Sequence, residues 1–219
     1  MIGPSAVLWD LDGTLVDSEE FHWQSWRDAM RAEGIELSYP QFLASFGQRN
    51  DRILASWLGA GADPDRVRHI GEAKEAEYRR LAAAHGLTAL PGAREWLIAL
   101  RSAGWKQAIA SSAPRLNVET MLHALRLDRE VDAIVSAEDV TLGKPDPQVF
   151  LEAAGKLAVP PARCIVVEDA AAGVEAARRA GMHSIGVNPR QRLDADVYVA
   201  SLADLPPDTF DSFVRRAER

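Results

Sequence analysis

The sequence predicts an α/β protein in which a doubly wound parallel sheet forms the core and an all-helical cap is inserted into it. Three features of the chain support this prediction. Short apolar segments bounded by turn residues recur along it, as expected for strands buried on both faces of a parallel sheet. Amphipathic helical patterns lie between most of these segments, an alternation typical of doubly wound sheets. One long stretch near the start contains helical patterns only.

Six apolar segments are predicted to be strands. The first runs from Ser5 to Trp9 and ends abruptly at Asp10, where turn residues begin. Apolar runs of this length bounded by turns are typical of buried strands. The other five, in chain order, are residues 106–110, 131–135, 164–167, 183–187 and 196–199, and the last two have the weakest pattern.

Helices are predicted between these strands. The segment from Gly92 to Ala103 places its apolar residues on one face of a helix, and Gly104 follows it as the glycine that ends many helices does. Similar patterns occupy residues 116–125, 147–157 and 173–180.

The stretch from Ser18 to about Ala84 breaks the alternation, because it has no strand pattern. Ser18 followed by Glu19 and Glu20 is a typical helix start, since acidic residues in the first turn interact favourably with the helix dipole. Directly after the first strand, such an insert is placed to cover the end of that strand. We therefore expect a Rossmann-like core of residues 1–15 and 88–219 and a helical cap of residues 16–87.

Composition limits the classes of function. The 219 residues, 47% of them hydrophobic, are enough for one core domain and a smaller insert. A net charge of -7 with scattered arginines argues against a nucleic-acid surface, which needs clustered basic residues. The single cysteine, Cys164, cannot form an internal disulfide, and no segment has the pattern of a secretion signal or a membrane span. We therefore expect a cytoplasmic protein that binds neither nucleic acid nor membranes.

The strongest chemical signal is the segment Asp10-Leu11-Asp12-Gly13-Thr14, directly after the first strand. Two carboxylates one residue apart raise each other's pKa unless a cation joins them. Mg²⁺ is the simplest such cation, because it takes oxygen ligands from a few carboxylates and from substrate phosphates. An acidic surface turn is the alternative interpretation.

A second carboxylate pair, Glu168-Asp169, follows the strand at residues 164–167. Ligands of open α/β sheets bind beyond the carboxyl ends of the strands, where two acidic strand ends side by side form a metal site. The alternative is a helix N-terminus with favourable acidic residues.

Lys144 lies in the segment Gly143-Lys144-Pro145-Asp146-Pro147, whose prolines restrict the backbone and hold the lysine in a stiff loop. Its point charge suits a phosphate or a charged nucleophile. The segment is not a Walker loop, since Pro145 stands where serine or threonine is required. A solvated surface lysine is the alternative.

Ser111 and Ser112 follow the strand at residues 106–110. A hydroxyl and backbone N–H groups at a helix start can hold a phosphate. A serine nucleophile is the competing idea, but no Gly-x-Ser-x-Gly turn surrounds either residue. A plain turn serine is the other alternative.

Together, four such signals in this order resemble the four motifs of the haloacid dehalogenase (HAD) superfamily, and the all-helical insert after the first strand resembles its cap. Within the superfamily, the chain is similar to the branch of β-phosphoglucomutase and small sugar-phosphate phosphatases. The residues concerned are Asp10, Asp12, Thr14, Ser111, Lys144, Glu168 and Asp169.

The resemblance implies a mechanism. Asp10 would attack phosphorus to form an aspartyl-phosphate, and Asp12 would protonate the leaving alcohol and later activate water or an acceptor hydroxyl. Ser111 and Lys144 would bind the transferring phosphoryl group, and Lys144 would also pair with Asp10. The Mg²⁺ ligands would be Asp10, the backbone carbonyl of Asp12, and Asp169, with Glu168 as a further ligand or a hydrogen-bonding neighbour.

The same resemblance implies substrate contacts from the cap. Ser18, His22, Arg49 and Lys74 lie near positions that contact the substrate or its second phosphate in the mutase-like branch, and we add Ser112 as a phosphate contact. The loop Gly47-Gln48-Arg49 is one residue shorter than expected in those mutases. For His22 and Lys74, a capped helix face and a solvated lysine are the alternatives.

We therefore expect a Mg²⁺-dependent phosphatase of a small phosphorylated metabolite, with sugar phosphates as the expected class, acting as a monomer. A β-phosphoglucomutase-type hexose-phosphate mutase with the same nucleophile is the alternative. A catalytically idle binding protein is disfavoured because Asp10, Asp12, Lys144 and Asp169 are all present.

Overall fold

The computed structural model describes residues 5–59 and 61–216, and its larger unit is built on a six-stranded parallel sheet. The strands lie in the order β5-β4-β1-β6-β7-β8, and every neighbouring pair is parallel. Their bounds are β1 Ala6–Trp9, β4 Lys106–Ala110, β5 Ala133–Val135, β6 Cys164–Glu168, β7 His183–Val187 and β8 Val197–Val199. All six correspond to predicted strands, so the predicted α/β class is confirmed.

Helices cover both faces of this sheet. Side chains alternate along β1, so that Val7 and Trp9 pack on one face while Ala6 and Leu8 pack on the other. The first face is covered by α5 (Ala93–Ser102), α6 (Arg115–Leu125) and α9 (Thr209–Arg216). The second is covered by α7 (Gln148–Leu157) and α8 (Ala171–Arg179). Both faces of the sheet therefore carry apolar side chains, which explains why helices cover the sheet on both sides.

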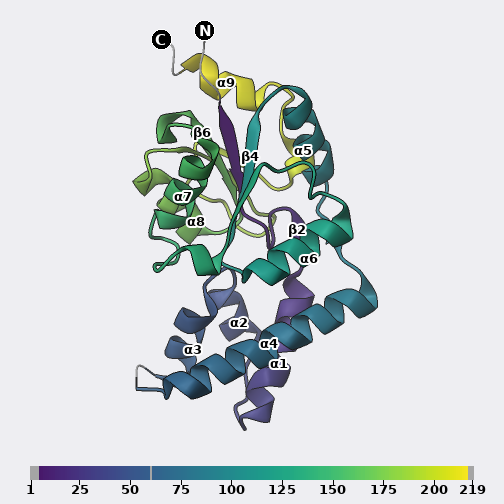
Figure 1. Cartoon of the computed structure of the whole chain (residues 1–219), viewed down its shortest axis with the longest axis vertical. Helices are drawn as coiled ribbons and strands as arrows, with labels where there is room; N and C mark the ends of the chain where they lie inside the picture. The colour runs from purple at the N-terminus through teal and green to yellow at the C-terminus, as the bar shows by residue number, and fades with distance from the viewer. Residues whose placement is uncertain (1–4, 60, 217–219) are drawn as a thin grey trace.

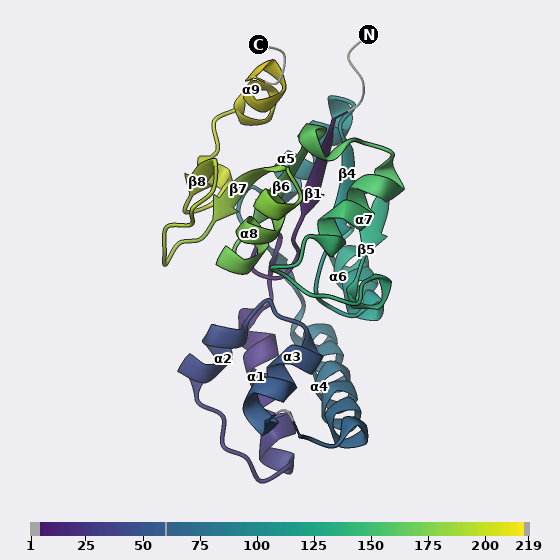
Figure 2. The same ribbon diagram turned by 90° about the vertical axis from the view of Figure 1, so that its left-hand side faces the viewer.

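A second, helical unit lies at one end of the sheet, as Figures 1 and 2 show. We call it the cap unit. Its helices are α1 (Glu19–Ala32), α2 (Tyr39–Ser45), α3 (Asn50–Leu58) and α4 (Pro64–His85). It has a core of its own, formed by Trp26, Met30, Phe42, Ile53, Leu54 and Ile70. The Asp63 side chain accepts a hydrogen bond from the Asp65 backbone N–H, and Pro64 occupies the first turn, so the start of α4 is set locally.

The two units are joined by a short antiparallel ribbon of β2 (Val16–Asp17) and β3 (Thr88–Ala89). This ribbon was not predicted from the sequence, because two residues are too few to show a strand pattern. Also not predicted were α9 and the 3-10 helices at Ala137–Asp139, Pro161–Arg163 and Leu202–Asp204. The division into core (1–15 and 88–219) and cap (16–87) remains our proposal, and the position of the ribbon at both boundaries supports it.

The strand order determines where a site can form. β1 is paired with β4 on one side and β6 on the other, so the connections run in opposite directions from β1 and leave a crevice at its carboxyl end. Asp10, Ser111 and Asp169 follow the ends of these three strands. Among the described helices, none combines the length and the apolar character needed to cross a lipid bilayer.

Candidate active site

Asp10 lies at the centre of the crevice, immediately after β1. Its backbone N–H donates to the Val167 carbonyl at 2.9 Å, which continues the parallel pairing of β1 with β6 by one residue. The chain then turns sharply, and Gly13 adopts a φ of 81°, which favours glycine. A Cβ at Gly13 would lie 2.3 Å from Oδ2 of Asp169. Glycine at this position therefore allows the two acidic strand ends to approach each other.

Lys144 is buried between two carboxylates. Its Nζ lies 2.5 Å from Oδ1 of Asp10 and 2.5 Å from Oε1 of Glu168. Burial alone would lower the pKa of Lys144, but these two carboxylates raise it well above its usual value. The side chain is therefore a charged ammonium that holds the Asp10 carboxylate in place.

Three carboxylates form an acidic cluster beside this lysine. One oxygen each of Asp10, Glu168 and Asp169 lies within 4.8 Å of the others. Burial raises the pKa of Asp10 to about 7, with Lys144 opposing the shift and Glu168 adding to it. Burial and the charge of Asp10 raise the pKa of Asp169 well above its usual range. The protein alone therefore does not fully compensate the negative charge gathered here.

The donor set of the cluster suits a hard cation. All of its donors are carboxylate oxygens, the ligands that Mg²⁺ prefers. Glu168 already accepts from Lys144 and, through Oε2, from the Ala170 N–H at 3.0 Å. Within residues 5–59 and 61–216, by contrast, no side chain or backbone N–H donates to the Asp169 carboxylate. A half-buried carboxylate without a donor is a natural cation ligand.

Asp12 lies in a different environment from Asp10. Its Oδ1 accepts from Ser18 Oγ at 2.6 Å and contacts Nε2 of His22 at 2.9 Å. Burial favours the neutral carboxyl, but the interactions with His22, the Ser18 hydroxyl and the charge of Lys74 lower the pKa of Asp12 overall. The two carboxyls of the Asp-x-Asp motif therefore have opposite pKa shifts, because Asp10 lies beside other carboxylates and Asp12 beside hydrogen-bond donors.

His22 connects Asp12 to a lysine in the cap unit. Nζ of Lys74 lies 2.8 Å from Nδ1 of His22, and the lysine side chain is only 2% exposed. Because a lysine ammonium can only donate, Nδ1 accepts and the ring proton lies on Nε2, facing Asp12. Tyr78 stacks on the imidazole at a centroid distance of 4.2 Å and holds its plane. The cap unit thus positions a donor on Asp12.

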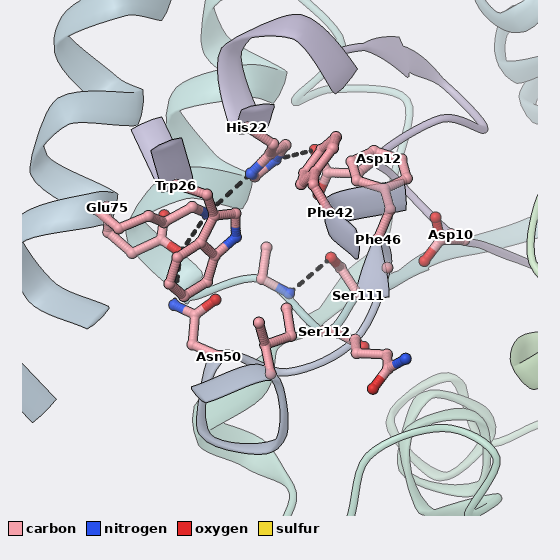
Figure 3. A pocket seen from close by; sticks show the side chains of 15 residues that line it. Asp10, Asp12, His22, Trp26, Phe42, Phe46, Asn50, Glu75, Ser111 and Ser112 are labelled. Atoms are coloured by element: carbon pink, nitrogen blue, oxygen red, sulfur yellow. Dashed lines mark hydrogen bonds and ion pairs between the residues drawn. The ribbon is translucent and has the colours of Figure 1, made fainter. Parts of the chain in front are cut away.

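Ser111 and Ser112 line the same cavity as Asp10 and Asp12. The Ser111 N–H donates to the Val135 carbonyl at 3.0 Å, which continues the pairing of β4 with β5, and its Oγ accepts from the Ala113 N–H at 3.0 Å. In Figure 3, Ser111 lies on the side of the cavity where Asp10 lies. Ser111 is therefore fixed by the turn that follows β4.

Comparison with known proteins places this geometry in a family. A profile of haloacid dehalogenase-like hydrolases matches residues 4–181. The chain belongs to this family. Hexitol phosphatase B of Escherichia coli (strain K12) is 33% identical over 215 residues, which are 91% of this chain and 93% of that protein. Beta-phosphoglucomutase of Bacillus subtilis (strain 168) is 33% identical over 211 residues, which are 91% of each chain.

Structural comparison agrees with this assignment. The crystal structure of beta-phosphoglucomutase from Clostridium difficile has a TM-score of 0.89 at 27% identity, with 99% of this chain and 100% of that chain covered. The plant protein SUPPRESSOR OF QUENCHING 1 of Arabidopsis thaliana is 36% identical over 84% of this chain, but the match spans only 18% of that longer protein. The predicted HAD membership is therefore confirmed, and this HAD-like hydrolase is an enzyme of phosphoryl transfer.

Most site residues expected from the sequence come together in this HAD-like hydrolase. Six of them line one cavity: Asp10, Asp12, His22, Lys74, Ser111 and Ser112. Ser18 contacts Asp12, and Lys144, Glu168 and Asp169 surround Asp10. The side chain of Asp12 points to His22 rather than to the acidic cluster, so only its backbone carbonyl is left for the expected metal role. The individual roles remain predictions.

Arg49 lies elsewhere. Its guanidinium donates to the backbone carbonyls of Ala137 at 2.6 Å and Val140 at 2.9 Å, and it pairs with Asp51. It is not among the residues that line the cavity. In this arrangement Arg49 joins the cap unit to the core. Its expected substrate contact remains a prediction.

The sequence analysis did not identify the remaining cavity residues. These are Trp26, Phe42, Phe46, Gly47, Gln48, Asn50, Ile53, Glu75 and Ala113. Glu75 follows Lys74 directly, and neighbouring opposite charges are ordinary on solvated helices. Nothing in the local pattern distinguished this glutamate from the exposed ones around it.

Proposed function

We propose that this HAD-like hydrolase is a Mg²⁺-dependent phosphatase of a small phosphorylated metabolite, with sugar phosphates as the substrate class. The observation that carries the proposal is the buried Asp10 carboxylate, which is paired with Lys144 and lines the same cavity as Asp12. The site thus combines a nucleophile (Asp10), a cation that orients it (Lys144) and a second carboxyl for proton transfer (Asp12). The relationship to hexitol phosphatase B supports the substrate class.

The reaction has two steps. In the first, a carboxylate oxygen of Asp10 attacks phosphorus, the bond from phosphorus to the substrate oxygen breaks, and Asp12 gives its proton to that oxygen. In the second, water attacks the aspartyl-phosphate, Asp12 takes the proton from the water, and Asp10 leaves as a carboxylate. The lowered pKa of Asp12 favours the base form needed in this second step.

Other residues supply positioning and charge. Lys144 orients Asp10 and, with Ser111 and Ser112, would bind the phosphoryl oxygens. Asp10, Asp169 and the Asp12 carbonyl would hold Mg²⁺, with Glu168 as a further ligand or a hydrogen-bonding neighbour. Bound there, Mg²⁺ would neutralise negative charge on the phosphoryl group.

The cavity between the cap unit and the core is small in the described arrangement. Its volume is about 40 Å³, whereas pockets that hold small molecules are typically roughly 300–1,000 Å³. A larger pocket of about 910 Å³ has Ser18, Lys144 and Asp169 among its lining residues, so the acidic cluster is reached from that side. A movement of the cap unit at the connecting ribbon of β2 and β3 would enlarge the smaller cavity and admit a substrate to it.

A hexose-phosphate mutase is the second candidate, because the beta-phosphoglucomutase of Bacillus subtilis is as similar as the hexitol phosphatase. The two reactions share the aspartyl-phosphate and differ in the acceptor, which is water in one and a sugar hydroxyl in the other. Product analysis separates them.

The test has two parts. A panel of sugar, polyol and nucleotide monophosphates is screened for phosphate release with Mg²⁺ and with excess chelator. β-Glucose 1-phosphate is then supplied with a trace of glucose 1,6-bisphosphate. The proposal predicts Mg²⁺-dependent release of phosphate. It is wrong if full turnover persists in chelator, or if glucose 6-phosphate forms far faster than free phosphate. The monomeric state, the cytoplasmic location and the absence of nucleic-acid binding remain predictions.

A further inference from the structure

Glu75 is a buried carboxylate inside the cavity that the proposed reaction does not use. Its side chain is 7% exposed, and the residue lines the same cavity as Asp10 and Asp12. Figure 3 shows Glu75 and Asp10 at opposite sides of this cavity, with Trp26 and His22 between them. A substrate whose phosphate lies on Asp10 would therefore extend its other end toward Glu75.

Three donors fix this carboxylate in place. Oε1 accepts from Lys74 Nζ at 2.8 Å and from Asn50 Nδ2 at 2.7 Å, and Oε2 accepts from Asn117 Nδ2. Asn117 belongs to α6 of the core, so the last contact crosses from the cap unit to the core. Burial would raise the pKa of Glu75, but the ammonium of Lys74 and these hydrogen bonds lower it overall. The residue is thus a fixed negative charge.

Lys74 balances this charge, and among the described residues that line the cavity no second cation is present to pair with a further phosphate of a substrate. Lys74 is the cationic residue at this end of the cavity, and its ammonium is already shared between Glu75 and His22. Three arginines of the cap unit donate to groups of the core instead of entering the cavity: Arg49 to Ala137 and Val140, Arg52 to the Lys144 carbonyl, and Arg79 to Asn117. A second phosphate at this end would lie beside the Glu75 carboxylate, whose partner Lys74 is already engaged in an ion pair with it.

The rest of this end is suited to an uncharged carbon chain with hydroxyl groups. Trp26, Phe42 and Ile53 present apolar surface to the cavity. A substrate hydroxyl can donate to the one remaining lone pair of Glu75, on Oε2, and the amide of Asn50 offers a further polar contact. A substrate hydroxyl at this end can therefore form hydrogen bonds with Glu75 and Asn50, whereas a phosphate would be repelled by the Glu75 carboxylate.

We propose that Glu75 selects monophosphates whose remote end is neutral and hydroxylated, and that it rejects substrates carrying a second phosphate there. This inference rests on the proposed phosphatase function and narrows its substrate class. Selectivity of this kind arises from a repulsive element built against the competitor. Because Lys74 is paired with Glu75, the pair offers a second phosphate no net positive charge, and a neutral residue at position 75 would free the Lys74 ammonium to bind that phosphate. A change of one unit charge about 5 Å away, at an effective dielectric constant of about 20, alters affinity by at least about tenfold.

The test measures the preference for a monophosphate over a bisphosphate, expressed as the ratio of the two kcat/KM values. kcat/KM for phosphate release is determined with glucose 6-phosphate and with glucose 1,6-bisphosphate, and Ki of each compound is determined against p-nitrophenyl phosphate. The wild type should favour the monophosphate in both measurements. Glu75→Gln should reduce this preference at least about tenfold, chiefly through KM for the bisphosphate. Glu75→Asp, which keeps the charge, should retain it.

Glu77→Gln is the matched control. Glu77 lies two residues further along α4, pairs with Arg80 at the surface and does not line the cavity, so the ratio should stay unchanged. A merely structural effect of Glu75→Gln would lower kcat/KM for both compounds alike and leave the ratio unchanged, which would overturn the inference. Equal Ki values for the two compounds in the wild type would also overturn it, whether or not the variant folds.

Failure of the proposed function is distinguishable from failure of this inference. A protein that releases no phosphate from any monophosphate refutes the phosphatase proposal. In that case both compounds are titrated against tryptophan fluorescence, since Trp26 lines the cavity, and equal affinities refute the role of Glu75. Tighter binding of the monophosphate supports it.

Discussion

Gly173→Ala tests whether the packing of α8 against Glu168 matters for the site. Gly173 is buried in the first turns of α8, and a Cβ there would lie 1.9 Å from Oε1 and 2.0 Å from Cδ of Glu168. Glu168 would have to leave the position in which Oε1 accepts from Lys144 and Oε2 accepts from the Ala170 N–H. The substitution therefore acts on the Lys144–Asp10 pair through its neighbour.

Two opposing effects set the magnitude. Replacing glycine by alanine within a helix normally stabilises it by about 0.8–1 kcal/mol. Overpacking of a buried position costs roughly 1–3 kcal/mol, and loss of one partner from a buried ion pair costs roughly 3–5 kcal/mol. The unfavourable terms are larger, so the free energy of unfolding should fall by about 3–7 kcal/mol, and kcat should fall because Lys144 is no longer held against Asp10.

Gly155→Ala provides the matched control. Gly155 lies exposed within α7, and a Cβ there would meet no heavy atom within 4 Å. This variant should be slightly more stable than the wild type and fully active. Urea unfolding and phosphate release are measured for both variants. Gly173→Ala behaving like Gly155→Ala in both assays would refute the reasoning.

Three further predictions concern the same structure. Asp10→Asn should reduce phosphate release at least about a thousandfold and prevent phosphoenzyme formation while the far-ultraviolet circular dichroism is retained; covalent phosphorylation of this variant by substrate would exclude Asp10 as the nucleophile. Burial raises the pKa of Asp10 to about 7, so without metal the folded state is weakened as the pH rises through 7. Since Mg²⁺ offsets the ionised charge, it should raise Tm more at pH 8 than at pH 6, and an equal rise at both would contradict the cluster as its site. Burial raises the pKa of the Cys164 thiol to about 11, so a thiol reagent at pH 8 should label the unfolded protein rapidly and the native protein hardly at all.

Much of the fold was predictable because its signals are local. The six apolar segments correspond to β1 and β4 to β8 with shifts of one or two residues at their ends. The helices predicted between them correspond to α5, α6, α7 and α8. The ribbon of β2 and β3 has two residues in each strand, so pairing across the molecule, rather than any periodic pattern, creates it.

The proximity of the core residues of the candidate site was predictable to a similar extent. Recognisable turn segments contain Asp10, Ser111, Lys144 and Asp169. A doubly wound sheet brings the carboxyl ends of its strands to one edge. The contacts that Lys144 makes span 134 residues to Asp10 and 24 to Glu168. Such proximity followed from the expected topology.

Which residues of the cap unit line the cavity depended on tertiary structure. By itself, the sequence determined which segments become strands or helices and which turns carry acidic, hydroxyl and cationic groups, since periodicity and turn chemistry act over a few residues. Only the packing of α4 against α1 and α6 decided that Lys74 and Glu75 are buried and line the cavity. The orientation of Arg49 toward the core likewise depends on a tertiary contact, its hydrogen bond to the Ala137 carbonyl. A charged residue on a helix has the same local pattern whether that helix face is solvated or covered, and the element that packs over it makes the difference.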